Sequence, residues 1–380
     1  MSAQETAPAD PIESMPIRLG PLGLSPTFSL TNFGIDSNVF NDPANPQSDF
    51  TLTATPKVVA RLRSSRLLMT GGLATGLVYY QKFDDERSID YATDGRVDLD
   101  LGAFRPYASA RRLDTKDRLN AELDLRTPRI SVNLAAGARV LATSRTGFRM
   151  EARRASVTFD EASIFEGVPL SETLNSETTT FEGGLELYLT PLTTLSVMAS
   201  RQEDRFDQSP ERDAASYKVM PTLKFEPPAI LQGTLGVGYR RFNGLAAAMP
   251  DFSGVVFEGG LTHIFVERTK LDVGVFRDVQ YSFEVEEPYY VTTGVRATIT
   301  HQVRDALDMR GTVSRDRLDY RSQQPDERRD TLTLVSAGTG YRFSPNLRIG
   351  VDLEFARRLS DRADRDYDRV RLLGSAAYGF

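Results

Sequence analysis

DYDRVRLLGSAAYGF, residues 366–380, is the stretch that decides the fold class. From Val370 to Phe380 every second residue falls on one face of an extended strand, because successive side chains in a strand point to opposite sides. That face is apolar and ends in Tyr378 and Phe380, whereas the other face, which begins with Arg371, is small and mixed. The pattern is typical of the closing strand of an outer-membrane β-barrel, with both aromatic residues in the periplasmic girdle. It also fits an edge strand of a soluble sandwich.

Composition excludes several classes of site and partner. The chain has no cysteine, which rules out disulfides, thiolate chemistry and cysteine-ligated metals. Its net charge is -6, and it carries no basic run interleaved with aromatic residues, so we expect no nucleic acid among its partners. A helical membrane span is not predicted either, because the chain has no window of about 18 uncharged apolar residues.

Alternating runs recur along the chain. Val97 and Leu99 alternate with Asp98 and Asp100, and residues 181–189 and 347–355 repeat the pattern with ionised groups on the second face. Charged groups cannot line a dry interior unless each is paired. A barrel with this face inside would therefore need a water-filled lumen, whereas a soluble sandwich would turn the same face to solvent.

The lengths of the connectors favour the barrel. Short turns are predicted at 63–66, 143–146, 190–193, 226–229, 267–269 and 344–346, and they alternate with long polar connectors at 36–48, 83–90, 161–176, 204–213, 243–251 and 322–328. Short turns at one end and long loops at the other are the plan of an up-and-down outer-membrane barrel. Residues 113–129 fit either one long loop or an extended strand.

We therefore predict an all-β fold, a transmembrane antiparallel up-and-down outer-membrane β-barrel of about 18 strands with a lumen wide enough for water. Residues 1–25, which contain four prolines, form an extended N-terminal segment, and residues 26–380 form the barrel, whose first strand is expected at 26–35. The N-terminus lacks the basic and apolar regions of a signal peptide, so a location in the bacterial outer membrane implies a leader peptide absent from this chain.

The alternation also nominates residues that line the lumen. They are charged side chains on the face opposite the apolar one. The candidates are Asp98, Asp100, Glu182, Glu186, Arg240, Asp272, Arg296, Arg348, Asp352 and Glu354.

A second set of candidates comes from a repeated element in strands that leave a short turn, as in MEARRAS (150–156) and EFARRLS (354–360). An arginine in each continues the apolar face, and such a residue is tolerated only near the membrane boundary. The predicted outer-rim arginine belt consists of Arg111, Arg154, Arg201, Arg241, Arg277, Arg315 and Arg357. These side chains either reach lipid phosphates at the outer boundary or, if local bulges turn them inward, form a basic ring around the lumen.

Enzymatic function is not expected, and no cofactor or metal site is predicted. The two histidines, His263 and His301, lie on the predicted lipid-facing register beside short turns, away from any serine or acid that could complete a catalytic site. The acidic triplet at 84–86 suits a solvated loop better than a calcium site.

Several segments resemble the β-barrel porin type 2 family of outer-membrane proteins. They are FGIDSNVFNDPANPQSDFTLTATPKVVARL (33–62), TPLTTLSVMASRQEDRFDQSPERDAASYKV (190–219), GVGYRRFNG (236–244), EPYYV (287–291) and the YGF terminus. The resemblance implies an outer-membrane channel that takes part in secretion of exopolysaccharide. Its expected partners are outer-membrane lipid, lipopolysaccharide, polysaccharide and periplasmic export components.

Two alternative functions stay open. The charged lumen alone supports a general or anion-preferring diffusion porin, because no dense aromatic track for a glycan stands out on the inner face, where Tyr188 and Phe276 are isolated. A structural barrel that scaffolds an envelope complex through the proline-rich N-terminus is the third hypothesis.

Overall fold

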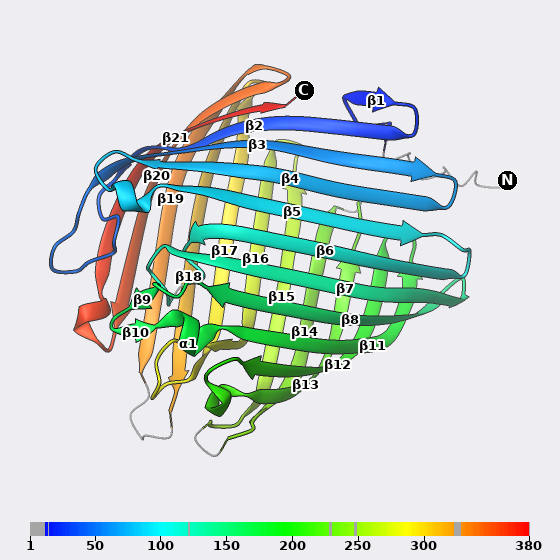
Figure 1. The fold of residues 1–380 in the computed structure, drawn as a ribbon. Coiled ribbons are helices and arrows are strands. Elements are labelled where there is room, and N and C mark those ends of the chain that lie inside the picture. Colours follow the sequence, from blue (N-terminus) through cyan, green and yellow to red (C-terminus); the bar gives the residue numbers. More distant parts are fainter. Residues whose placement is uncertain are drawn as a thin grey trace.

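The computed structural model describes residues 12–13, 15–120, 122–227, 230–246, 249–322 and 328–379. Within them, eighteen long strands build one wall (Figure 1). The first nine are β2 (Leu22–Asp36), β3 (Asp49–Ser64), β4 (Leu67–Tyr80), β5 (Ser88–Leu99), β6 (Phe104–Asp117), β7 (Thr127–Thr143), β8 (Thr146–Phe159), β11 (Ser176–Thr190) and β12 (Thr193–Phe206). The other nine are β13 (Ala214–Phe225), β14 (Leu231–Gly244), β15 (Phe252–Phe265), β16 (Thr269–Tyr281), β17 (Tyr289–Arg304), β18 (Leu307–Arg321), β19 (Arg329–Ser344), β20 (Leu347–Ser360) and β21 (Tyr367–Gly379).

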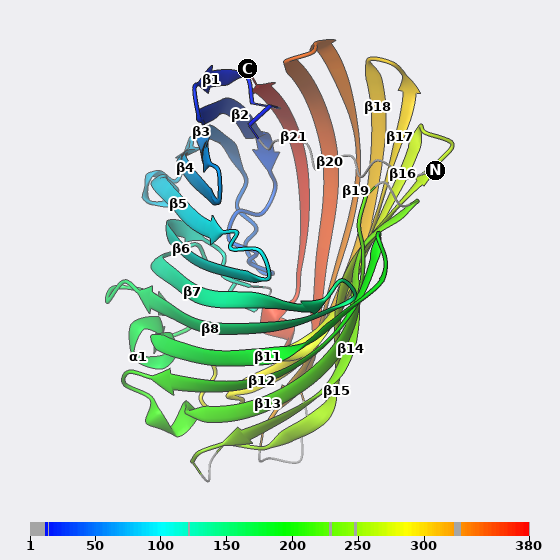
Figure 2. The same cartoon turned by 90° about the vertical axis from the view of Figure 1, so that its right-hand side faces the viewer.

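The wall is a closed antiparallel barrel. Each long strand pairs with the next along the chain, and β21 pairs with β2 from Thr27 opposite Gly379 to Asp36 opposite Arg371. Figure 2 shows the first and last strands meeting where the ring closes. Closure removes both sheet edges, as a bilayer requires. The predicted fold class and strand number are confirmed, although β2 begins at Leu22, which already pairs with Leu62 of β3.

The connectors follow the predicted alternation. Two-residue turns such as 65–66 and 144–145 lie at one end, and long connectors such as 37–48 and 160–175 lie at the other. β6 continues to Asp117, so the ambiguous segment is part strand and part loop, 118–126. The short elements are β1 (Ile17–Leu19), β9 (Ile164–Phe165), β10 (Val168–Pro169), α1 (Leu170–Leu174) and 3-10 turns at Asp84–Glu86, Pro210–Arg212 and Ala363–Arg365. No helix in the described ranges is long and apolar enough to cross a membrane.

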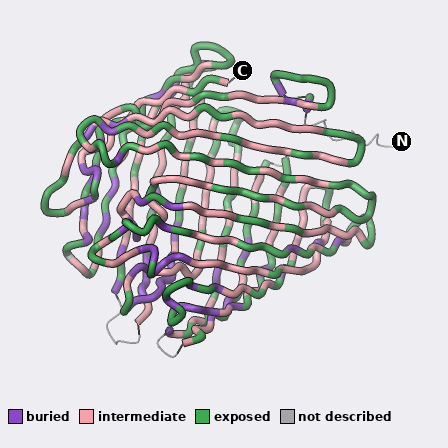
Figure 3. The backbone as a smooth tube through the Cα atoms, viewed as in Figure 1, coloured by how far each residue is buried: buried purple, intermediate pink, exposed green. Residues whose placement is uncertain are grey.

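Buried residues gather at the long-loop end, and the rest of the wall alternates between exposed and half-buried positions (Figure 3). Large apolar side chains such as Leu73, Phe181 and Val237 are exposed on the outer face, with Phe181 62% accessible. Water-soluble monomers rarely expose contiguous apolar surface on this scale. The outer face therefore suits the hydrocarbon of a bilayer.

One seam interrupts the regular pairing. β15 and β16 pair only as far as Phe257 opposite Arg277, although beyond that point β15 still pairs with β14 and β16 with β17. Fully buried Phe242, Val256 and Tyr289 lie beyond the point of separation. Apolar packing thus replaces the missing ladder at the long-loop end of the wall.

Candidate functional site

The inner face of the wall is identified by contacts that skip a strand. The Tyr107 hydroxyl of β6 donates to Glu151 of β8, and the Arg139 guanidinium of β7 lies 2.6 Å from the Glu186 carboxylate of β11. Side chains two strands apart converge in this way on the concave side of a barrel. The registers then assign every second residue of each strand to the lumen.

The predicted lumen residues share this face. Nine of them lie on inward positions of the strands, and Asp100 follows β5 in a short turn that borders a lumen cavity. Most are engaged by a neighbouring opposite charge. The pairs are Asp98 with Arg96, Asp100 with Arg105, Glu186 with Arg139, Arg240 with Asp278, Asp272 with Lys270, Arg348 with Asp308, Asp352 with Arg310, and Glu354 with Arg371.

A cavity of about 500 Å³ lies beside the short turns that follow β3 and β5, and we call it the basic cavity. Six guanidinium groups line it, from Arg63, Arg66, Arg96, Arg105, Arg139 and Arg149, against three carboxylates, from Asp98, Asp100 and Glu151. Arg96 also lies 4.3 Å over the ring of Tyr107, which holds its planar group in place. The lining therefore carries an excess of positive charge, although the chain as a whole is acidic.

A second cavity of about 560 Å³ lies on the wall formed by β17 to β21 and β2. Arg296, Arg310, Arg348 and Arg371 line it together with Asp352, Glu354 and several serine and threonine hydroxyls. Arg296 forms no hydrogen bond or ion pair with a described residue, so its donors face the lumen. Basic groups thus reach the lumen from two sections of the wall.

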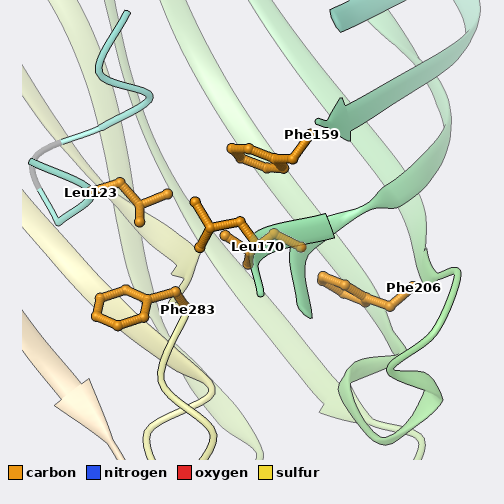
Figure 4. Packing of buried hydrophobic residues seen from close by; sticks show 6 residues of the cluster. Leu123, Phe159, Leu170, Phe206 and Phe283 are labelled. Carbon is orange, nitrogen blue, oxygen red and sulfur yellow. The ribbon is translucent and has the colours of Figure 1, made fainter. Parts of the chain in front are cut away.

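The long-loop end is occluded by three connectors, 118–126, 160–175 and 282–288, which we call the loop plug. Leu123, Leu170 and Phe283, one from each connector, are at most 1% accessible and pack with Phe159 and Phe206 (Figure 4). These connectors follow β6, β8 and β16, which are far apart around the wall. The loops therefore meet over the lumen.

Buried charges fix the loop plug to the wall. The Arg358 guanidinium of β20, which is fully buried, contacts Asp124 and Asp330 at 2.5 Å. The Glu122 carboxylate accepts a 2.6 Å hydrogen bond from the Ser282 hydroxyl. Burial raises the pKa of Glu122 to about 7, even though nearby Arg365, Arg328 and Arg358 each lower it. Glu122 therefore exchanges its proton close to neutral pH.

The predicted arginine belt does not follow one register. Arg154, Arg201, Arg241, Arg315 and Arg357 are exposed on outward positions. Arg111 is different, because it lies two residues from Ser109 and four residues from Tyr107, and therefore shares the lumen-facing side of β6. The outward position on β6 belongs to Arg112, so including Arg111 in the outer belt was wrong.

Arg277 also departs from the belt. It lies at the last paired position of the β15–β16 seam, where it is half-buried and donates to Thr293. Arg277 is therefore less exposed than the other five arginines.

The structure also gives the positions of the two histidines, Tyr378 and the acidic triplet. His263 and His301 lie beside short turns on the outward register, and His301 bonds to Thr269. Tyr378 is outward and 38% accessible near the end of β21, whereas Phe380 lies outside the described residues. No group of three metal-ligating side chains occurs in the described ranges. Glu86 of the acidic triplet pairs with Lys116 and Arg126 instead.

The loop plug is the functional feature that the sequence leaves undecided. Its local signals are apolar residues within the connectors, such as Leu123, Leu170 and Phe283. Their packing joins segments 160 residues apart, which periodicity along one strand does not report.

A closed antiparallel barrel with an apolar outer face and a charged lumen defines an outer-membrane channel of the porin type. The chain belongs to the family described as "Putative beta-barrel porin 2", whose model matches residues 10–376. This match confirms the family resemblance and places the protein in the outer membrane. No curated protein matches the sequence.

Solved channels share the fold. OpdK of Pseudomonas aeruginosa with vanillate has a TM-score of 0.54 and 10% identity, and covers 94% of this chain and 99% of its own. OccK2 (OpdF) of the same organism in complex with glucuronate has a TM-score of 0.55 and 8% identity, with 94% and 98% covered. OccAB3 of Acinetobacter baumannii has a TM-score of 0.51 and 9% identity, with 94% and 99% covered. Identities this low show the fold alone.

Proposed function

We propose that this porin is a diffusion channel that prefers small organic anions. The observation that carries the proposal is the basic cavity, where six guanidinium groups meet three carboxylates. Two channels of similar fold were solved with vanillate and with glucuronate, and both molecules carry a carboxylate. A planar guanidinium binds a carboxylate through two parallel hydrogen bonds, which favours such solutes over neutral ones.

The ion pairs of the basic cavity are suited to exchange with a passing anion. The side chains of Arg96 and Asp98 are 45% and 38% accessible, and that of Arg139 is 40% accessible. Pairs in contact with water contribute only about 0–1 kcal/mol, so a mobile carboxylate can replace a fixed one at low cost. Weak, repeated binding is what a conducting lumen requires.

Exopolysaccharide secretion, which the family resemblance implies, has less support. The loop plug packs across the long-loop end, which narrows the path for a long polymer more than for a small solute. Tyr188 and Phe276 remain isolated aromatic groups on the inward register. No contact in the structure specifically favours a glycan or an export complex.

The test is ion selectivity in planar bilayers, measured as the reversal potential across a salt gradient. The triple variant Arg96→Gln, Arg139→Gln, Arg149→Gln should lose anion preference, because the cavity then keeps three carboxylates against three guanidinium groups. An outward variant, Arg315→Gln, removes a positive charge outside the lumen and should keep the wild-type value. Equal reversal potentials for the wild type and the triple variant would refute the proposal.

A further inference from the structure

Three outward residues form a row across the outer face near the long-loop end. Arg201 of β12 lies directly opposite Tyr217 of β13, and Tyr217 lies directly opposite Arg241 of β14. Neighbouring strands are about 4.8 Å apart, so the two arginine backbones are roughly 10 Å apart with the tyrosine between them. We call this set the arginine row.

The two guanidinium groups differ in their engagement. Arg201 pairs with Glu203 on its own strand and lies 5.8 Å from the ring of Tyr217. Arg241 is exposed and makes no hydrogen bond or ion pair with any residue in the described ranges. Its five N–H donors therefore point from the outer wall with no protein acceptor.

The position of the row determines what can satisfy these donors. Val219 and Tyr239, one outward position closer to the short-turn end, and Val237, two positions closer, are all about half exposed and form part of the apolar outer face. The row therefore lies where that face ends toward the long loops. Exposed tyrosines are typical of the boundary between hydrocarbon and headgroups. The guanidinium N–H donors of Arg241 therefore lie at the level of the lipid headgroups.

We propose that the arginine row binds a phosphate group of an anionic glycolipid in the outer leaflet. An arginine fork matches phosphate oxygens through two hydrogen bonds, and a second guanidinium on the far side of Tyr217 can engage the same headgroup. Tyr217 and Tyr239, 53% and 54% accessible, present ring faces to the sugar and the upper acyl chains.

Other outward arginines lack this combination. Arg154 pairs with Glu177, as Arg201 does with Glu203, but the aligned residues two strands away from it are Glu203 and Ala110. Arg357 pairs with Asp368. Arg315 of β18 and Arg357 of β20 flank Thr333 of β19 in the same way, and Arg315 has no charged partner among the described residues, but the residue between them is threonine rather than tyrosine. The arginine row is thus the place where two basic groups and two aromatic rings come together.

The absence of tryptophan from the chain allows a site-specific probe. Tyr239→Trp, beside the row, reports binding through its fluorescence when the refolded full chain in detergent micelles is titrated with bis-phosphorylated lipid A. Dephosphorylated lipid A and inorganic phosphate are titrated in parallel. In the same background, Arg201→Gln with Arg241→Gln is compared with Arg139→Gln, which removes a lumen charge.

We expect saturable binding of bis-phosphorylated lipid A, weakened roughly tenfold or more in the double variant and unchanged in Arg139→Gln. Equal binding of dephosphorylated lipid A would overturn the proposal, because the phosphate would then contribute nothing. Inorganic phosphate saturating the probe at the same concentration would also overturn it, since the site would then recognise a free anion. Wild-type affinity in the double variant would exclude the row as the binding surface.

Discussion

The basic cavity and the loop plug use the same arginine–carboxylate chemistry in opposite environments. In the cavity, the side chains of Arg96 and Asp98 are 45% and 38% accessible. Where the plug meets the wall, the side chains of Arg358 (β20) and Asp330 (β19) are both 0% accessible. Water screens the first pair and leaves it exchangeable, whereas burial makes the second costly to separate. One set of charges is thus suited to passing solutes and the other to holding three loops across the mouth.

Removing part of the plug should have the largest effect. Replacement of residues 119–125 by a glycine–serine linker of equal length deletes Glu122 and Leu123, which are buried between the other loops. Single-channel conductance should rise several-fold, because the mouth loses the connector after β6, whose Asp124 contacts Arg358 on β20. Replacing the exposed loop tip 43–46 in the same way is the control and should leave conductance unchanged. Wild-type conductance in the 119–125 variant would mean that the plug does not limit flow.

The next largest effect should be a difference in the free energy of unfolding between variants that break a buried ion pair and variants that break an exposed one. Arg358→Ala removes one of the two buried arginines that pair with Asp330, Arg328 being the other, and should cost about 3 kcal/mol in the free energy of unfolding, the lower end of the range for a broken buried pair. Arg96→Ala breaks an exposed pair and should cost about 0–1 kcal/mol. Urea unfolding of the refolded proteins in lipid vesicles measures both. Similar losses in the free energy of unfolding for the two variants would show that the buried and the exposed ion pairs contribute equally to stability.

A pH dependence should arise in the plug. Burial raises the folded pKa of Glu122 to about 7 from its ordinary value of 4.5, so between these pH values the closed plug keeps a proton that a solvent-exposed loop has lost. Closure is therefore favoured in acid and lost as the pH rises through about 7. Conductance should increase from pH 5 to pH 8.

Glu122→Gln is the matched variant for this dependence. The amide keeps an acceptor for the Ser282 hydroxyl and carries no charge at any pH, so the plug should stay closed across the range. A steep pH response that survives in Glu122→Gln would assign the titration to another group.

The strand wall could be predicted from sequence because its signal is local. Val97 and Asp98 or Phe181 and Glu182 contrast strongly in polarity, so alternation shows which residue faces water. The same argument failed at Arg111, where Ala108, Ser109 and Ala110 are all small and give no contrast between faces. The Tyr107–Glu151 hydrogen bond identifies which side of β6 faces the lumen, and it joins two residues that are 44 positions apart in the sequence.

The loop plug lay beyond sequence reasoning for a related reason. Leu123 and Phe283 lie in separate connectors, and neither connector has a sequence pattern that predicts their packing in one cluster. The positions of the loops follow from closure of the ring, which brings β6, β8, β16 and β20 to one mouth.

The smallest effect should come from a single carboxylate in the basic cavity. Asp98→Asn removes a negative charge that competes with solute anions for Arg96, so anion preference should rise. Because the pair is exposed, the increase should not exceed about fivefold, the factor that corresponds to 1 kcal/mol, and the free energy of unfolding should stay within about 0.5 kcal/mol. Reversal potentials and urea unfolding check the two statements, with the outward variant Glu203→Gln as control. A loss of anion preference in Asp98→Asn would show that this carboxylate orients Arg96 for the solute rather than competing with it.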